Sequence, residues 1–180
     1  MGDPREVLLA ASALLTYPDD VLATREAYVR EAARSFSRSA RQHFEEFQRH
    51  VQRVGLWALQ QEYVETFDLQ GGVPLYLTPP TLKDDRERGF ALVELKRRYR
   101  AGGLQPSSTE LPDFLPMFLE FMGLAERTAG RSLGSQYLAT VEGLASQLHR
   151  RRSAYAPLLD ASVAALRSLV GPLPHRRATE

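Results

Sequence analysis

The sequence predicts an all-α protein, a single-domain bundle of about eight helices. Apolar residues recur at helical spacing along most of the 180 residues, no segment sustains the alternation of a β-strand, and no repeat of fixed period appears. A chain of this length can bury roughly 70% of its unfolded surface. We expect residues 1–172 to form the domain and residues 173–180 to be a disordered tail.

The first third of the chain is expected to contain three helices. They cover residues 4–16, from 19 or 20 to 35, and from 37 or 39 to 54. Asp3 and Pro4 are a suitable N-cap and first helical residue for the first of them. Pro18 ends this helix because proline disfavours helical geometry in the residue before it. Gly55 ends the third helix.

The fourth helix, residues 56–68, is expected to have an apolar stripe on one side and acidic residues on the other. The stripe consists of Leu56, Leu59, Tyr63 and Phe67. At about 100° per residue, Glu62, Glu65 and Asp68 centre nearly opposite the stripe, and we call these three residues the acidic ridge. A water-facing helix side is the ordinary interpretation of the acidic ridge, and a binding role is the alternative.

Two Gly/Pro-rich breaks separate the fourth helix from those that follow. Residues 69–83 are expected to form a stiff loop with at most one helical turn, since Gly71-Gly72 and Pro79-Pro80 bracket its centre. The remaining helices are expected from about residue 84 to 102, from 112 onward, over 137–148 and over 155–170. Pro112 would occupy the first helical position of the sixth helix. That helix is apolar around nearly its whole circumference, so it should lie in the centre of the domain.

The charge distribution favours a basic partner over a nucleic acid. The whole chain has a net charge of +1, but residues 62–126 carry 7 basic and 11 acidic side chains. This net acidic stretch would attract a basic segment and repel phosphate.

Composition and motifs give no support for catalysis. Without cysteine, the chain has no disulfide, no thiolate metal site and no cysteine nucleophile. No catalytic or phosphate-binding motif is present, and the four histidines do not cluster. We therefore expect no catalytic residue, no metal site and no cofactor.

The sequence also predicts a cytoplasmic protein. The first residues lack the positive charge of a signal peptide, and no apolar run approaches the roughly 20 residues of a membrane span.

A cluster of alternating charges, residues 83–89, lies at the start of the fifth helix. Its acidic residues suit the helix N-terminus, whereas Arg86 and Arg88 oppose the helix dipole. We expect these arginines to reach carboxylates elsewhere, with the acidic ridge as a candidate.

Four motifs occur in consistent order and spacing between about Tyr63 and Phe121. They read YVETFDL, LYLT, DDRERGFALVELKRRYRAGGL and ELPDFLPMFLEF. This third of the chain resembles the central signature of the nitrate reductase assembly chaperones, the delta-subunit family, within the redox enzyme maturation chaperones.

The resemblance implies an all-helical, non-enzymatic chaperone, monomeric or weakly dimeric. It would bind the apo catalytic (alpha) subunit of a nitrate reductase through that subunit's N-terminal segment, and a further surface of it. It would assist molybdenum cofactor insertion before the enzyme docks at the membrane, without entering the membrane itself.

The resemblance also carries over candidate partner-binding residues. They are Tyr63, Glu65, Phe67, Asp68, Leu75, Tyr76, Asp84, Arg86, Arg88, Pro112 and Asp113. For Tyr63, Phe67 and Leu75 a core role is an equal alternative, and Asp68, Arg86 and Arg88 are alternatively scaffold residues. Phe114 stands where relatives often carry histidine, and we assign it mainly to the core.

Other functions remain as alternatives. A chaperone of a related molybdenum oxidoreductase fits the same signature. A helical DNA-binding regulator would account for the arginines, but the basic residues cluster at helix ends and not along one recognition helix. A small helical enzyme would need a polar pocket that the sequence does not reveal.

Overall fold

The computed structural model describes residues 2–78, 85–105 and 110–171. These residues form seven α-helices and one π-helical turn: α1 Pro4–Leu15, α2 Leu22–Ala32, α3 Arg38–Tyr63, η1 Val64–Asp68, α4 Asp85–Ala101, α5 Leu115–Leu124, α6 Arg127–Arg150 and α7 Ala156–Val170. The predicted all-α class is confirmed, with a helix count close to the expected eight. No helix in these ranges is long and apolar enough to cross a membrane. The predicted tail, residues 173–180, lies outside them.

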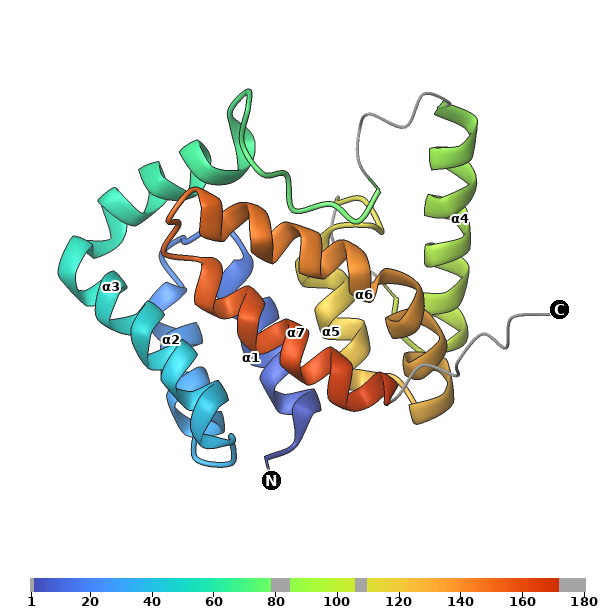
Figure 1. Cartoon of the computed structure of the whole chain (residues 1–180), viewed down its shortest axis with the longest axis horizontal. Coiled ribbons are helices and arrows are strands. Elements are labelled where there is room, and N and C mark those ends of the chain that lie inside the picture. Colours follow the sequence, from blue (N-terminus) through green and yellow to red (C-terminus); the bar gives the residue numbers. More distant parts are fainter. Residues whose placement is uncertain (1, 79–84, 106–109, 172–180) are drawn as a thin grey trace, which may run out of the picture.

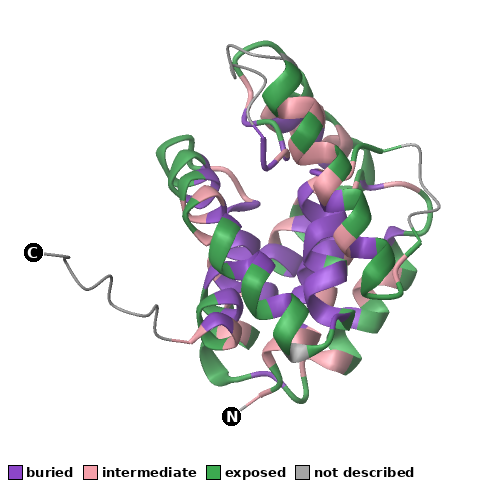
Figure 2. Ribbon diagram, turned by 90° about the vertical axis from the view of Figure 1, so that its right-hand side faces the viewer, coloured by how far each residue is buried: buried purple, intermediate pink, exposed green. Residues whose placement is uncertain are grey.

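Helix α1 lies in the middle of the bundle and contacts α2, α5 and α7 (Figure 1). The Asp3 carboxylate caps its N-terminus by accepting a hydrogen bond from the Arg5 N–H at 2.9 Å, and Pro4 begins the helix, as predicted. Leu8 and Leu15 are completely buried. Figure 2 shows the buried residues gathered in the centre of the ribbon.

Helix α5 is the apolar centre that its composition predicts, since eight of its ten residues are buried. Its start differs from the prediction: the helix begins at Leu115, and Pro116, not Pro112, lies in its first turn. Helices α6 and α7 pack along each other beside α5 (Figure 1). A Cβ on Gly134 of α6 would lie 2.9 Å from side-chain carbons of Met122 and Val170, so glycine permits this close approach.

The predicted third and fourth helices are two arms of one element, α3. They meet at Gly55, where φ is 77° and ψ is 169°. The N-terminal arm covers residues 38–54 and the C-terminal arm residues 56–63, which continue into η1. The predicted apolar stripe is buried except at its first residue, Leu56, which is 40% exposed directly after the kink.

In the described part of the predicted loop, residues 69–78, no helical turn forms, although the sequence allowed one. The Leu77 N–H donates to the Asp113 carbonyl at 2.9 Å, and the Leu115 N–H donates to the Leu75 carbonyl at 2.8 Å. These bonds form an isolated antiparallel bridge between Tyr76 and Phe114, whose rings lie 5.6 Å apart. The bridge ties the loop after η1 to the start of α5.

Helix α4 stands at one end of the molecule, opposite α3 (Figure 1). Its inner residues Leu95 and Tyr99 are buried. The Tyr99 hydroxyl donates to the Pro112 carbonyl at 2.8 Å, and the Tyr99 ring contacts that of Phe121 at 4.8 Å. These contacts attach α4 to α5 and to the strand-like segment before it.

Candidate functional site

Four of the predicted partner-binding residues are buried: Tyr63, Phe67, Leu75 and Asp113. The rings of Tyr63 and Phe67 lie 4.8 Å apart, and the Tyr63 hydroxyl donates to the Leu15 carbonyl at 3.2 Å. Burial raises the pKa of Tyr63, with Asp68 as the next cause. This burial favours the core interpretation of Tyr63, Phe67 and Leu75.

Asp113 is the centre of a buried polar cluster. Its Oδ2 accepts hydrogen bonds from the Thr78 hydroxyl and, at 3.3 Å, from the Thr78 N–H. Arg88 Nη2 lies 3.8 Å from the same oxygen, and Arg88 Nε donates to the Thr78 hydroxyl at 3.5 Å. Arg88 therefore reaches a carboxylate, as expected, but that carboxylate is Asp113 and not the acidic ridge. Arg88 and Asp113 act as scaffold residues that join α4 to α5.

The other predicted residues lie nearer the surface. Glu65, Asp68 and Arg86 are exposed, and Tyr76 and Pro112 are half-buried; Asp84 lies outside the described residues. The Tyr76 hydroxyl donates to Glu110 Oε2 at 3.3 Å. Desolvation and, secondarily, Glu110 raise the pKa of Asp68. Glu110, which the motif comparison did not single out, thus extends the acidic surface beyond the ridge.

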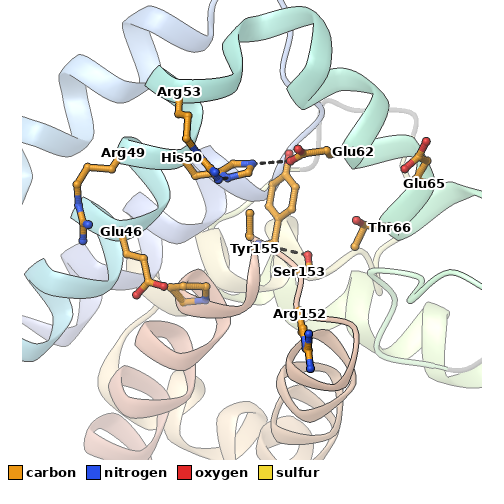
Figure 3. Close-up of a pocket in the computed structure, with 12 residues that line it drawn as sticks. Glu46, Arg49, His50, Arg53, Glu62, Glu65, Thr66, Arg152, Ser153 and Tyr155 are labelled. Carbon is orange, nitrogen blue, oxygen red and sulfur yellow. Dashed lines mark hydrogen bonds and ion pairs between the residues drawn. The ribbon is translucent and has the colours of Figure 1, made fainter.

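A cleft of about 620 Å³ lies between the two arms of α3 and the connection from α6 to α7 (Figure 3). We call it the α3 cleft. Its walls are formed by Glu46, Arg49, His50, Arg53, Glu62, Glu65, Thr66, Arg152, Ser153, Ala154, Tyr155 and Pro157. Two members of the acidic ridge, Glu62 and Glu65, belong to it, so the kink at Gly55 brings part of the predicted surface against residues from the other arm.

A hydrogen-bonded chain spans the kink on one side of the α3 cleft. His50 Nε2 lies 2.5 Å from Glu62 Oε2, and Arg53 Nη2 lies 2.8 Å from His50 Nδ1. Because a guanidinium only donates, Nδ1 is the acceptor and Nε2–H donates to Glu62. Glu62 is therefore held by the opposite arm, whereas Glu65 remains exposed to a partner.

The floor of the α3 cleft is aromatic. Figure 3 shows the Tyr155 ring rising from the α6–α7 connection toward Glu62. This ring contacts Phe47 and Phe67, each at 5.0 Å. The buried Tyr155 hydroxyl has no hydrogen-bond partner among the described residues. Burial is the main cause that raises the pKa of Tyr155, so the hydroxyl stays neutral beneath the cleft surface.

Several cleft residues were not predicted because they come from outside the motif-bearing stretch. The four histidines do not cluster in the sequence, so His50 was not singled out, and the structure shows it half-buried. Its partner Glu62 is twelve residues away, across Gly55, and no periodicity indicates such a contact. Tyr155 read as an apolar residue of the last helix. Its orphaned hydroxyl is a feature of packing alone.

The described residues contain no group of three or more His, Cys, Asp or Glu side chains that could hold a metal ion. What the α3 cleft does offer is a floor that includes Tyr155 and a rim of both charge signs. Glu65 lines the cleft, whereas the exposed acids Asp68 and Glu110 lie outside its lining, near enough to each other for Glu110 to raise the pKa of Asp68. We call Glu65, Asp68 and Glu110 the acidic border. Such a surface suits the binding of a short polypeptide segment.

Comparison with known proteins gives a consistent family. Residues 33–161 match the family model described as nitrate reductase delta subunit. The chain is 38% identical over 164 residues to the probable nitrate reductase molybdenum cofactor assembly chaperone NarJ of Bacillus subtilis (strain 168), covering 89% of this chain and 88% of that protein.

Two relatives from Escherichia coli (strain K12) are more distant. The nitrate reductase molybdenum cofactor assembly chaperone NarJ is 31% identical over 157 residues, 85% of this chain and 66% of that protein. The probable assembly chaperone NarW is 27% identical over 156 residues, 87% of this chain and 66% of that protein.

Proposed function

The chain belongs to the nitrate reductase delta subunit family, and from that premise we propose that it binds the N-terminal segment of an apo nitrate reductase catalytic subunit. Its relatives are named as molybdenum cofactor assembly chaperones, which are not enzymes. Bound to this chain, the client would remain competent for cofactor insertion, in the cytoplasm and before membrane docking. The molybdenum cofactor belongs to the client and not to this chain.

The α3 cleft with its acidic border is the observation that supports this proposal. An amphipathic helix places apolar anchors in a groove and its charged residues on the rim. Here the aromatic floor would receive the anchors, and the exposed carboxylates of Glu65, Asp68 and Glu110 would pair with lysine or arginine side chains of the client. Two exposed apolar residues, Trp57 in the C-terminal arm of α3 and Leu69 directly after η1, would add contact area.

The family assignment weighs against the DNA-binding and enzymatic alternatives. A chaperone of a related molybdenum oxidoreductase remains the second candidate within the same mode of action. The two are distinguished by the sequence of the client peptide, because each catalytic subunit has its own N-terminal segment.

Titration calorimetry tests the proposal. The titrant is a synthetic peptide of about the first fifteen residues of the catalytic subunit, and saturable binding is expected. The variant E65K/D68K should bind at least about tenfold more weakly, since charge pairs steer and hold the peptide. The control D20K/E120K makes the same change in net charge at two exposed sites outside the cleft and should bind like the natural chain.

No heat of binding at peptide concentrations up to about 1 mM would contradict the proposal. Equal weakening in both variants would mean that net charge, and not the acidic border, governs the interaction. Circular dichroism of each variant separates lost binding from lost folding.

A further inference from the structure

The outward side of α4 carries two of the most exposed large apolar residues of the described chain. Phe90 is 75% exposed and Val93 is 69% exposed. At about 100° per residue, both lie within about 60° of each other on the helix surface, and Arg97 lies between them. We call Phe90, Val93, Lys96, Arg97 and Arg100 the α4 outer face.

The opposite side of the same helix is already used for packing. Leu95 and Tyr99 are buried, and Arg98 Nη1 donates to the Ser132 hydroxyl at 3.2 Å. Together with the bonds of Tyr99 to Pro112 and of Arg88 near Asp113, these contacts fix which way α4 faces. The outer face is therefore presented by an anchored helix, and an exposed apolar pair on such a helix is typical of an interaction site.

Basic side chains surround the apolar pair. Residues 93–101 contain four basic side chains and one acidic side chain. Lys96 and Arg100 are exposed and form no ion pair with any described residue. Arg97 is paired with Glu94 through two hydrogen bonds of 2.8 and 2.9 Å. Two cations thus remain for an anionic partner.

We propose that the α4 outer face docks an acidic segment with an apolar anchor on the body of the client, separate from the client's N-terminal segment. This inference rests on the proposed function. The N-terminal segment is expected to be basic because the α3 cleft has an acidic border, and a basic segment would be repelled by Lys96 and Arg100. In addition, α3 and α4 lie at opposite ends of the molecule (Figure 1).

An anionic membrane is the competing partner, and the composition of the helix disfavours it. A helix that lies on a membrane buries a broad apolar face. The exposed large apolar side chains of α4 are Phe90 and Val93, and the exposed carboxylate of Glu87 on the same helix would be repelled by lipid phosphates. A protein segment needs only a small anchor site with matched charges.

The test compares one variant with two titrants. F90S/K96Q/R100Q removes the anchor and both unpaired cations, all at exposed positions. The titrants are the synthetic N-terminal peptide and the whole apo catalytic subunit. We expect unchanged affinity for the peptide and at least about tenfold weaker affinity for the whole subunit, because two linked contacts become one. The control L124S/R38Q/R150Q removes one exposed apolar side chain and two exposed cations elsewhere on the surface, and it should leave both affinities unchanged.

The outcomes separate this inference from the proposed function. Failure of the natural chain to bind the peptide contradicts the proposed peptide site, whereas weaker capture of the whole subunit by the α4 variant would still support a contact on α4. Unchanged affinity of the variant for the whole subunit overturns the α4 inference alone. Equal loss for both titrants overturns it too, since α4 would then belong to the peptide site. Binding to phosphatidylglycerol vesicles that the variant loses, with client affinity unchanged, would assign the face to a membrane.

Discussion

The buried carboxylate of Asp113 joins three separate stretches of the chain at the level of single residues. It lies before α5, accepts two hydrogen bonds from Thr78 in the extended segment, and neutralises Arg88 on α4. Its Oδ1 has no hydrogen-bond partner among the described residues, so one acceptor of the cluster is left unused. A buried ion pair of this kind specifies an arrangement more than it stabilises the fold.

Replacing Asp113 by alanine should lower the free energy of unfolding by about 2–4 kcal/mol, because the Thr78 donors and Arg88 would lose their acceptor in a dry site. Urea denaturation at pH 7 measures this loss. D113N, which keeps a carbonyl oxygen for Thr78, should lose less. If D113A unfolds at the same urea concentration as the natural chain, the cluster has no structural role.

The exposed acid Asp68 should make stability depend on pH. Desolvation, and then Glu110, raise its folded-state pKa above the unfolded value. The folded chain therefore binds a proton at Asp68 more tightly than the unfolded chain does. At neutral pH, where Asp68 is ionised, this difference destabilises the fold. D68N should raise Tm at pH 7, and the gain should shrink as the pH falls toward the ordinary pKa of an aspartate, about 3.9. Scanning calorimetry between pH 7 and pH 4 checks this, and a gain independent of pH would contradict it.

At the scale of elements, the kink in α3 creates the cleft. Gly55 has a conformation, φ 77° and ψ 169°, that is nearly restricted to glycine. A Cβ there would meet no other atom within 4 Å, so backbone strain alone restricts the position. The chain from Arg53 through His50 to Glu62 holds the two arms together on the cleft side.

Gly55→Ala should cost about 1–3 kcal/mol of unfolding free energy and weaken binding of the client peptide, since relief of the strain would change the angle between the arms. Chemical denaturation and calorimetry measure the two effects. Gly143→Ala in α6 is the matched control: it also has open space around its Cβ, but its φ is not positive. That substitution should stabilise the chain by about 0.5–1 kcal/mol. A G55A chain as stable as G143A would show that the kink is not strained.

At the scale of the whole molecule, periodicity predicted the helices well but not how they meet. The apolar circumference of residues 115–124 correctly placed α5 in the centre, because complete burial leaves a direct mark on composition. Glycine at position 55 correctly indicated a break in the helix. It did not indicate whether a loop would separate two helices there or whether the helix would continue across a kink. The α3 cleft exists because the two arms meet at an angle, so its residues from the N-terminal arm were not predicted.

The candidate site was predictable only in part, for a similar reason. Of the candidate residues that the motifs supplied, Glu65 lines the α3 cleft, but a motif does not distinguish side chains that support a surface from those that form it. Tyr63 and Phe67 turned out to be buried, whereas Glu65 and Asp68 are exposed. Long-range pairs such as Arg88 with Asp113 or His50 with Glu62 have no sequence periodicity, because they depend on where separate elements are brought together.

The central place of α1 has a consequence for biosynthesis. This helix is made before the helices that cover it, and two of the three, α5 and α7, begin 100 or more residues later. At typical elongation rates of about 5–20 residues per second, α5 is synthesised roughly 5–20 s after α1, and during that time the apolar side of α1 cannot pack against it. A protein proposed to shield a client's segment thus emerges from the ribosome with an unshielded segment of its own.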